Sequence, residues 1–529
     1  MLQITRTVCT DAVSTDFEIT INDQRAFSLK TRVSAIPFNR LWPGKQRPIE
    51  QSELASYLSL AADEPVTVRV RPTRPFERAV MRPLSEGIVL TCTDDEITFT
   101  ISGVGQYTLE LDGSHRALHI FVDPILDFGV DPEGERVLYF GAGVHHVGQL
   151  DLADDTTVYI DRDAVVYGSI LAVGRHNVRI LGYGVLDGGW EERETENFLL
   201  AYDYTRAPRD NWEWEQMHSR FSSTPDLFPV LDDGYVPGTG SILYRGREHF
   251  YRVLDAMKPV KSGIHLYACQ NVEIRGIILR DSAGLTATQA GCEGIRYDNV
   301  KLIGMWRYNS DGIDFYNCRH CSITNSFLRT FDDTVGMKGQ LGWDTENTTD
   351  ILVDNCVLWN DWGHTLEFGA DTVVSEICRI TFRNCDIIHH THAALDIKNM
   401  DRAHIHDVLF ENIHVEYTAQ DLFPQYQSSD DTVYTYTCAV APLISVGLEC
   451  CMWSCDHLWG KNDHITFRGI HVHTDPDMPF PTSSLSGHDE THTTRAIRFE
   501  GITHNSTPIR SLEEMNLSIG PFVSDITIS

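Results

Sequence analysis

The chain has 529 residues, more than one ordinary compact core holds, so we expect two domains or one elongated domain. Hydrophobic residues make up 42% and charged residues 22%, which is typical of a globular protein that folds in water. The formal net charge is −32 at pH 7, and such a polyanion repels nucleic acid and anionic lipid. No apolar run approaches the ~18 residues of a membrane span. Neither nucleic acid nor a membrane is therefore expected as a partner.

The amino terminus and the cysteines indicate a cytoplasmic protein. The first twenty residues lack a charged start followed by an apolar stretch, so no signal peptide is visible. The 13 cysteines are odd in number, and several lie inside strand-like segments, where a free thiol acts as a small apolar residue. Those in strand-like segments are Cys269, Cys292, Cys318, Cys356 and Cys385.

Residues 1–125 alternate apolar and polar side chains in short runs such as FEITIN, VTVRVRP and EITFTIS. Alternation with period two, broken by turn residues, is typical of half-buried antiparallel strands. A β-sandwich of this length fits the pattern. It carries no catalytic motif, and its role in capping the next domain or shaping a cleft is left open.

From residue 126 to residue 529 the sequence predicts a right-handed parallel β-helix. An apolar-x-apolar run beside an asparagine or glycine recurs, and the marker residue repeats at intervals of 23, 26, 30, 29 and 28 between Gly276 and Asn412. Coils of ~20–30 residues are typical of stacked solenoids. The next interval, from Asn412 to Gly469, is 57 residues, which corresponds to two coils. The markers are Gly276, Asn299, Asn325, Asn355, Asn384, Asn412, Gly469 and Gly501.

Three segments interrupt this repeat and are interpreted as loops on the solenoid. They are residues 190–262, 418–440 and 474–494, and insertions in solenoids tend to gather on the binding face. Within the first, Trp212 and Trp214 could stack against a sugar. The alternative is that these two side chains only pack the loop onto the helix.

Three aspartates dominate the stretch 309–338. Asp311 precedes the adjacent pair Asp332 and Asp333 by 21 and 22 residues, about one coil, so the chain should stack them together. Carboxylates crowded in this way cannot all ionise freely, and at least one should have a raised pKa. A proton donor beside a proton acceptor is what acid/base hydrolysis requires.

Aligning the coils extends this cluster into three ladders with a spacing of ~4.8 Å per coil. The first contains Asp311, Asp333 and His364, with Asp332 just before it. The other two lie on the outward face of the same strands. One comprises Asp314, Gly336, Glu367 and Asp396, and the other comprises Tyr316, Lys338, Gly369 and Lys398. Polar residues are also normal on a solvated sheet face, so Asp314, Glu367 and Asp396 could be surface residues without a role.

Four motifs within residues 309–398 carry a family resemblance. NSDGID, FDDTVGMKG, GHTLEFG and DIK, in that order, resemble the motifs NTDG, DD, GHG and RIK of the polygalacturonases, glycoside hydrolase family 28. The related dextranases and isopullulanases, family 49, use a similar aspartate triad and also place a β-sandwich before the β-helix.

The resemblance implies an inverting glycosidase that needs no cofactor or metal and acts on an oligosaccharide or polysaccharide. By it, Asp332 is the general acid, and Asp311 and Asp333 hold and deprotonate the attacking water. His364 assists near the acid. Substrate contacts are expected from Asn309, Asp314, Lys338, Glu367, Asp396, Lys398, Trp212 and Trp214. A homo-oligomer is left open.

One departure from the motifs affects the substrate. The chain has Asp396 where the polygalacturonase motif RIK has arginine, the usual bidentate partner of a carboxylate. An acid at this place repels a uronate, which favours a neutral glycan over galacturonan.

Three other functions stay open from the sequence. A glycan transferase of the fructan type and a β-helix lyase would change the chemistry on the same solenoid, and a solenoid that only binds carbohydrate would have no chemistry at all.

Overall fold

The computed structural model describes residues 1–6, 13–34, 52–189, 263–282, 284–307, 310–340, 342–343, 347–418, 440–451, 454–456 and 458–529. Strands dominate these residues, and the helical elements there are two 3₁₀ turns, η4 (Leu84–Glu86) and η5 (Ser114–Arg116). A search of the same residues finds no helix with the length and apolar character needed to span a bilayer. The predicted all-β class is confirmed.

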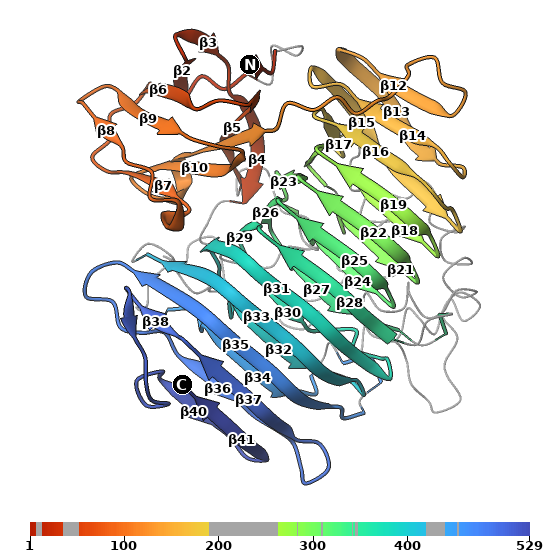
Figure 1. The fold of residues 1–529 in the computed structure, drawn as a ribbon, viewed down its shortest axis with the longest axis vertical. Helices are drawn as coiled ribbons and strands as arrows, with labels where there is room; N and C mark the ends of the chain where they lie inside the picture. Colours follow the sequence, from red (N-terminus) through yellow and green to blue (C-terminus); the bar gives the residue numbers. More distant parts are fainter. Residues whose placement is uncertain are drawn as a thin grey trace, which may run out of the picture.

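The chain as far as Asp123 forms two sheets (Figure 1). The six-stranded sheet consists of β1 (Leu2–Ile4), β5 (Ser52–Ala62), β11 (Ala117–Asp123), β10 (Gly105–Leu111) and β7 (Ala79–Arg82), with β4 (Leu29–Ser34) on β5. The five-stranded sheet consists of β3 (Gln24–Ala26), β2 (Phe17–Ile21), β6 (Val66–Pro72), β9 (Ile97–Ile101) and β8 (Thr91–Cys92). Pairing is antiparallel except between β11 and β5.

The period-two pattern explains how these sheets pack. The strand FEITI buries alternate residues, and Ile19 meets Leu60 and Ile120 of the other sheet in one core. Side chains of the two sheets therefore share one apolar core. Strand pairing changes between Asp123 and Val137, close to the predicted domain boundary at residue 125.

The remaining strands form one sheet of 30 strands that winds into a parallel β-helix with three rows (Figure 1). The first row is β12 (Val137–Phe140), β14 (Thr157–Ile160), β16 (Arg179–Gly182), β19 (Gln270–Arg275), β22 (Glu293–Asp298), β25 (Arg319–Thr324), β28 (Asn347–Asp354), β31 (Glu376–His389), β33 (His404–Tyr417), β35 (Lys461–Thr474), β37 (Thr494–Glu500) and β41 (Val523–Ile528).

The second row is β13 (Gly143–Asp151), β15 (Ala164–Val173), β17 (Val185–Asp187), β20 (Ile278–Arg280), β23 (Lys301–Ile303), β26 (Phe327–Thr330), β29 (Val357–Asn360), the second halves of β31, β33 and β35, and β38 (Thr503–His504), to which β39 (Thr507–Pro508) adds antiparallel. The third row begins on the second halves of β13 and β15. It continues with β18 (Ile264–Tyr267), β21 (Ala287–Ala290), β24 (Ile313–Tyr316), β27 (Val335–Lys338), β30 (Leu366–Phe368), β32 (Leu395–Asn399), β34 (Ile444–Leu448), β36 (Ser483–Leu485) and β40 (Leu517–Ile519).

The repeat markers lie at the corner between the first and second rows, and all eight have a positive φ. Asparagine and glycine tolerate this left-handed conformation, which explains why they recur. The asparagine side chains also bond from coil to coil: Asn355 Nδ2 donates to Asn325 Oδ1 at 2.8 Å, and Asn412 Nδ2 donates to Asn384 Oδ1 at 2.9 Å.

Two details of the predicted repeat are wrong. β33 pairs directly with β35, so the 57 residues from Asn412 to Gly469 make one long coil rather than two. The extra residues lie before and after β34 in the sequence, and the register between β33 and β35 is kept. The segment 474–494 is also more than a loop, because it contains β36.

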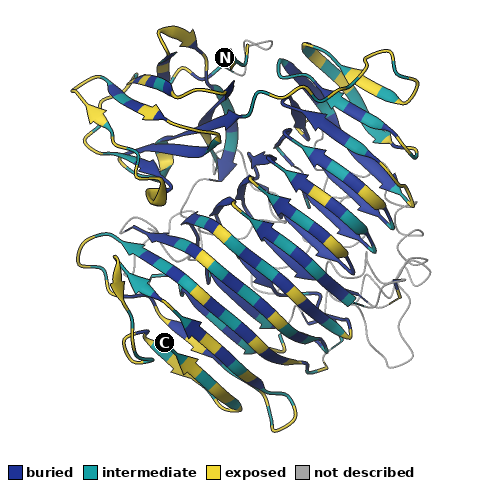
Figure 2. Cartoon of the chain, viewed as in Figure 1, coloured by how far each residue is buried: buried dark blue, intermediate teal, exposed yellow. Residues whose placement is uncertain are grey.

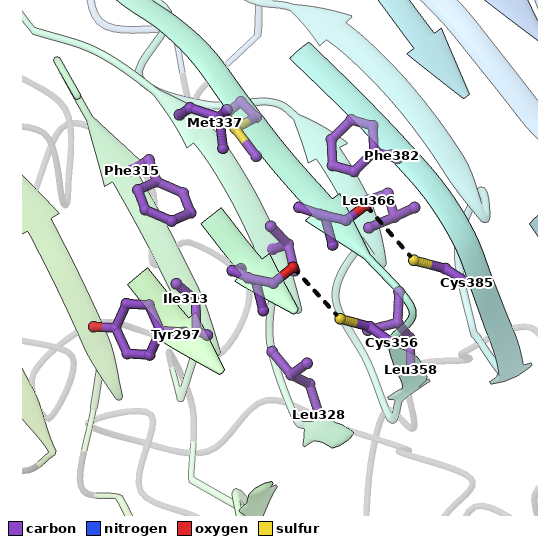
Figure 3. Close-up of a cluster of buried hydrophobic side chains, with 14 of the residues drawn as sticks. Tyr297, Ile313, Phe315, Leu328, Met337, Cys356, Leu358, Leu366, Phe382 and Cys385 are labelled. Atoms are coloured by element: carbon purple, nitrogen blue, oxygen red, sulfur yellow. Dashed lines mark hydrogen bonds between the residues drawn. The ribbon is translucent and has the colours of Figure 1, made fainter. Parts of the chain in front are cut away.

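The inside of the helix is filled by side chains of like size stacked from coil to coil. Phe382, Phe410 and Phe467 stack at centroid separations of 4.9 and 5.0 Å. Figure 3 shows Cys356 and Cys385 within this core, pointing at backbone oxygens of the preceding coil. Every cysteine among the described residues is a free thiol. In Figure 2 exposed positions recur across successive strands, while the residues facing inward are buried.

The six-stranded sheet packs on the outer face of the second row. Tyr57 and Phe121 from that sheet share an apolar cluster with Phe327 and Trp359 of β26 and β29. Buried ion pairs flank the cluster: Lys301 with Asp123, and Arg82 with Glu416. The amino-terminal sheets are thus fixed along the side of the solenoid.

Candidate active site

The structure confirms the predicted coil alignment around the aspartates. In the third row Asp314 pairs with Gly336, Gly336 with Glu367, and Glu367 with Asp396. The turns that lead into these strands also stack, because Gly312 N donates to Asp333 O and Thr334 N donates to His364 O, both at 2.7 Å. Asp311, Asp333 and His364 therefore occupy equivalent places on successive coils.

The third predicted ladder is interrupted. Tyr316 pairs with Lys338 as expected, but the next bridge joins Gly339 to Thr372, so the register shifts by two residues after β30. Gly369 then lies outside the strand, and Lys398 pairs with Gly447 on the next coil. The prediction that Lys338, Gly369 and Lys398 stack in one line is wrong, because the chain makes room for Glu367: a Cβ on Gly369 would lie 1.6 Å from Glu367 Oε1.

Lys338 is the centre of the site. Its Nζ lies 3.3 Å from Asp311 Oδ2, 3.4 Å from Asp314 Oδ1 and 3.3 Å from Asp333 Oδ2. The ammonium is buried, and although burial lowers its pKa, the charges of the surrounding groups outweigh that effect and raise the pKa. One cation therefore serves three carboxylates, with nothing apolar between them.

This shortage of positive charge separates the pKa values of the three acids. Burial raises the pKa of Asp311 well above its ordinary value and that of Asp314 to about 7, despite the opposing effect of Lys338. Burial acts on Asp333 too, but Lys338, a hydrogen bond with Glu367 and the nearby His364 together lower its pKa. The expectation that at least one clustered aspartate has a raised pKa is confirmed for Asp311.

Glu367 is a buried neighbour of Asp333. Burial, the charge of Asp333 and a hydrogen bond with Asp333 raise the pKa of the Glu367 carboxyl well above its ordinary value. Asp333 Oδ1 also accepts the backbone N–H of His364 at 3.1 Å. These contacts hold Asp333 ionised and in one orientation.

His364 is supported from behind by an acid. Its Nδ1 lies 2.6 Å from Asp396 Oδ2, and Lys398 Nζ lies 3.9 Å from the same oxygen. Asp396 replaces the arginine of the RIK motif, but in this structure it faces the histidine. A buried carboxylate in contact with an imidazole fixes the place of the ring.

The structure corrects the expected exposure of three substrate contacts. The residues Asp314, Glu367 and Asp396 are only 1%, 3% and 0% exposed, so they form a buried layer. The partly exposed edge in front of them consists of Asp332, Asp333, His364 and Lys398. Packing against the turns covers the outward ladder, which strand alternation alone predicts to be solvated.

Two residues near the site were missed from the sequence. His392 lies with its ring centroid 4.7 Å from that of His364, and burial lowers its pKa to about 3. It occupies the place of Asp332 two coils on, so extending the alignment past Gly363 would have found it. Asn360 Nδ2 donates to the backbone oxygens of Asp332 at 2.7 Å and His364 at 3.2 Å. These two contacts of Asn360 depend on the fold, and no sequence motif indicates them.

Three predicted substrate contacts, Asn309, Trp212 and Trp214, lie outside the described residues. Within the described part of the chain, two groups of side chains could hold a metal ion. One is part of this site, formed by Asp333, His364 and Glu367, where Lys338 Nζ lies 3.3 Å from Asp333 Oδ2. The other, formed by Glu376, Cys378 and His406, lies on the first row.

Comparison with known proteins agrees with this architecture. The sequence profile of "Glycosyl hydrolases family 28" matches residues 238–433. "Putative galacturan 1,4-alpha-galacturonidase A" of Aspergillus niger is 27% identical over 26% of this chain and 31% of its own length. "Probable exopolygalacturonase B" of Aspergillus terreus is 26% identical over 32% of this chain and 40% of its own length. The chain thus spans well under half the length of these two curated relatives.

A structural comparison covers the whole chain. Dex49A from Penicillium minioluteum superposes with a TM-score of 0.58 at 12% identity, over 99% of this chain and 96% of that one. At this identity the likeness concerns the fold alone, amino-terminal sheets included. The chain therefore has the parallel β-helix fold seen in Dex49A, and its residues 238–433 resemble glycoside hydrolase family 28, as the stacked aspartates do.

Proposed function

We propose that the chain hydrolyses glycosidic bonds with inversion of configuration and without a metal ion. The observation that carries this proposal is one ionised carboxylate, Asp333, beside carboxyl groups whose pKa is raised, at the partly exposed edge of the third row. A base and an acid kept in opposite protonation states by their surroundings are what this hydrolysis needs.

The roles follow from charge and position. Asp333 takes a proton from water as the water oxygen bonds to the anomeric carbon. Asp332 donates its proton to the glycosidic oxygen as the old bond breaks, and His364, backed by Asp396, lies beside this pair. Asp311 holds the water together with Asp333, and Lys338 keeps both carboxyl groups in place. The two products leave with no net change in the protons bound by the enzyme.

A second assignment of the acid has support from the pKa values. Burial raises the pKa of Asp311, one of the three aspartates of the predicted triad, so Asp311 could be the proton donor instead of Asp332. The two assignments differ in exposure, because Asp311 is buried whereas Asp332 reaches the surface.

A leaving-group experiment separates the two assignments. Each of Asp332→Asn and Asp311→Asn is assayed on a natural oligosaccharide and on the matching glycosyl fluoride, whose departure needs no acid. If Asp332 is the acid, Asp332→Asn loses about 10²–10⁴-fold on the oligosaccharide but far less on the fluoride, while Asp311→Asn loses equally on both. The reverse result assigns the acid to Asp311. Equal losses in both variants on both substrates would remove the acid role from each.

For the substrate we propose a neutral glycan. Among the described residues of the site the carboxyl groups outnumber the cations, and Lys338 is enclosed by three of them. The names of the curated relatives point the other way, to galacturonan. A panel of neutral and acidic oligosaccharides decides: turnover of oligogalacturonides with no turnover of neutral glycans would overturn the neutral assignment while leaving the hydrolase intact.

Product analysis distinguishes the hydrolase from the remaining functions. NMR of the first product should show a free sugar with the anomeric configuration opposite to that of the bond cleaved. A transferase would instead give a longer glycan, and a lyase would give an unsaturated product. A binding solenoid would show saturable sugar binding with no turnover.

A further inference from the structure

A cluster of three different metal-ligand types lies on the outer face of the first row, away from the third-row site. Glu376 and Cys378 are on β31, and His406 is on β33 directly opposite Cys378. The inward position between them on β31 is the buried Ile377, so all three side chains project from the same outer face. Their ligand atoms lie within 4.8 Å of one another.

The spacing suits a tetrahedral ion. Glu376 Oε2 and His406 Nε2 are 3.3 Å apart. Two ligands bound at about 2.0–2.1 Å in tetrahedral geometry are separated by roughly this distance. Thiolate, imidazole and carboxylate together are the ligand set that zinc-class ions prefer over magnesium or calcium.

Each ligand has a partner that holds it in place. His406 Nδ1 lies 2.8 Å from Asp407 Oδ2, an arrangement that keeps the proton on Nδ1 and turns the Nε2 lone pair towards Glu376. The other oxygen of Glu376, Oε1, accepts from Asn347 Nδ2 at 3.0 Å. At protein-bound metals, a carboxylate usually holds the second ring nitrogen of the histidine ligand in this way.

Two neighbouring side chains, His404 and Arg379, lie against the site without being among its proposed ligands. His404 lies beside His406, with ring centroids 4.2 Å apart, but its Nε2 contacts Asp463 Oδ2 at 3.0 Å. Arg379 covers the thiol and donates to Cys378 Sγ from Nη1 at 3.1 Å, and it must move for an ion to enter. The partly exposed Glu376 gives access from solvent.

We propose that Glu376, Cys378 and His406 bind one divalent transition-metal ion of the zinc class, with water as the fourth ligand. The ion links two successive coils through β31 and β33. It lies on the outer face of the first row, away from the third-row site. Binding releases the thiol proton, so the metal–thiolate bond replaces an S–H group and a hydrogen bond from Arg379.

The test uses the full chain, reduced and stripped with a chelator, and titrates it with Co²⁺ as a spectroscopic probe. We expect one equivalent to bind with a thiolate-to-cobalt charge-transfer band, and Zn²⁺ to displace it. Cys378→Ser should abolish the band, and Glu376→Gln and His406→Gln should weaken binding. Asp407→Asn, which leaves all three ligands intact, should weaken binding by about 10–100-fold.

Matched variants make the result decisive. Cys92→Ser removes an exposed thiol elsewhere and should leave the titration unchanged, and so should His404→Gln. Circular dichroism of each metal-free variant reports whether it folds; if Cys378→Ser does not, Asp407→Asn and His406→Gln carry the test. Binding below one equivalent, a spectrum without the thiolate band, or an unchanged titration in these variants would overturn the proposal. In that case His406 only makes side-chain contacts with Glu376 and Asp407.

Discussion

Two buried charge clusters in this protein have opposite balances. Where the amino-terminal sheets meet the second row, the carboxylates Glu110 and Glu416 meet two basic groups, Arg82 and His389. At the third row, Asp311, Asp314 and Asp333 surround the single ammonium of Lys338. Both clusters are removed from water, so the difference lies in the number of cations per carboxylate.

The pKa of Glu110 follows that difference, whereas burial raises the pKa of Glu416 despite Arg82. Burial alone would raise the pKa of Glu110, but His389 and Arg82 outweigh it and hold the pKa well below the ordinary range. In the third-row cluster, Lys338 cannot do this for every acid, and Asp311 and Asp314 keep raised values. A matched cluster joins two parts of a fold, whereas a deficient one leaves protons available for chemistry.

The largest expected effect is on the deficient cluster. Asp333→Asn removes the ionised member that faces the substrate edge, and turnover should fall by about 10²–10⁴-fold with the fold retained. Steady-state kinetics measures the loss, and circular dichroism checks the fold. Asp354→Asn, which changes an aspartate paired with Arg383 on the first row, is the matched control and should stay near normal. An Asp333→Asn enzyme of normal rate would contradict the assignment.

The next largest effect is expected from a substitution that breaks the cluster in which cations and carboxylates are equal in number. Arg82→Ala leaves Glu110 and Glu416 buried without their guanidinium partner, and the free energy of unfolding should fall by about 3–5 kcal/mol. Urea titration measures the loss. Arg78→Ala is the control: Arg78 also crosses from the amino-terminal sheets to the solenoid, at 3.2 Å from Asp475, but is exposed, so about 0–1 kcal/mol is expected. Equal losses in both variants would mean that burial of the pair is irrelevant.

A smaller effect concerns the pH profile. Below its raised pKa, the Glu367 carboxyl is neutral and can donate a hydrogen bond to the Asp333 carboxylate. As pH rises through that raised pKa, Glu367 ionises, repels Asp333 and activity falls. Glu367→Gln keeps a donor that cannot ionise, so its rate should be within about tenfold of the wild type while this alkaline limb is lost. A pH–rate profile with the same limb in Glu367→Gln would assign the limb to another group.

The smallest expected effect concerns Asp386 of the solenoid, which contacts Ser85 of the amino-terminal part of the chain. Burial raises the pKa of Asp386 to about 7, although Ser85 Oγ donates to it at 2.5 Å. The folded state therefore holds a proton that the unfolded state loses at its ordinary pKa near 4, so stability falls as pH rises from about 4 to 7. Asp386→Asn should remove this slope and gain about 1–2 kcal/mol at pH 8. Urea titrations at pH 5 and 8 measure it; a stability loss at pH 8 would contradict the sign.

The sequence alone predicted the parts of this molecule that depend on local repetition. The asparagine markers revealed the coils because a left-handed corner accepts few residue types, and the alignment then placed Asp314, Glu367 and Asp396 in one line. The predictions that were wrong concern features that depend on long-range packing. The bulge after β30 and the burial of Asp396 behind His364 follow from how neighbouring coils fit, which no local pattern contains.

The same distinction explains the residues that were missed. Asn360 acts through its position on β29, from which it reaches the backbone of two turns on different coils. The long coil between β33 and β35 was read as two because spacing gives only the contour length of a segment, and only pairing shows how many turns it makes.

The amino-terminal sheets also set the number of coils between their two contact points on the solenoid. They are anchored at Lys301 on β23 and at Glu416 on β33, and strand pairing puts four coil steps between these anchors. At ~4.8 Å per step this is a fixed span of about 19 Å. An open repeat protein can gain or lose a unit with little penalty, but here one coil more or fewer would pull an anchor out of reach. The number of coils between the anchors, and with it the place of the aspartates among them, is therefore fixed by a domain that carries no part of the site.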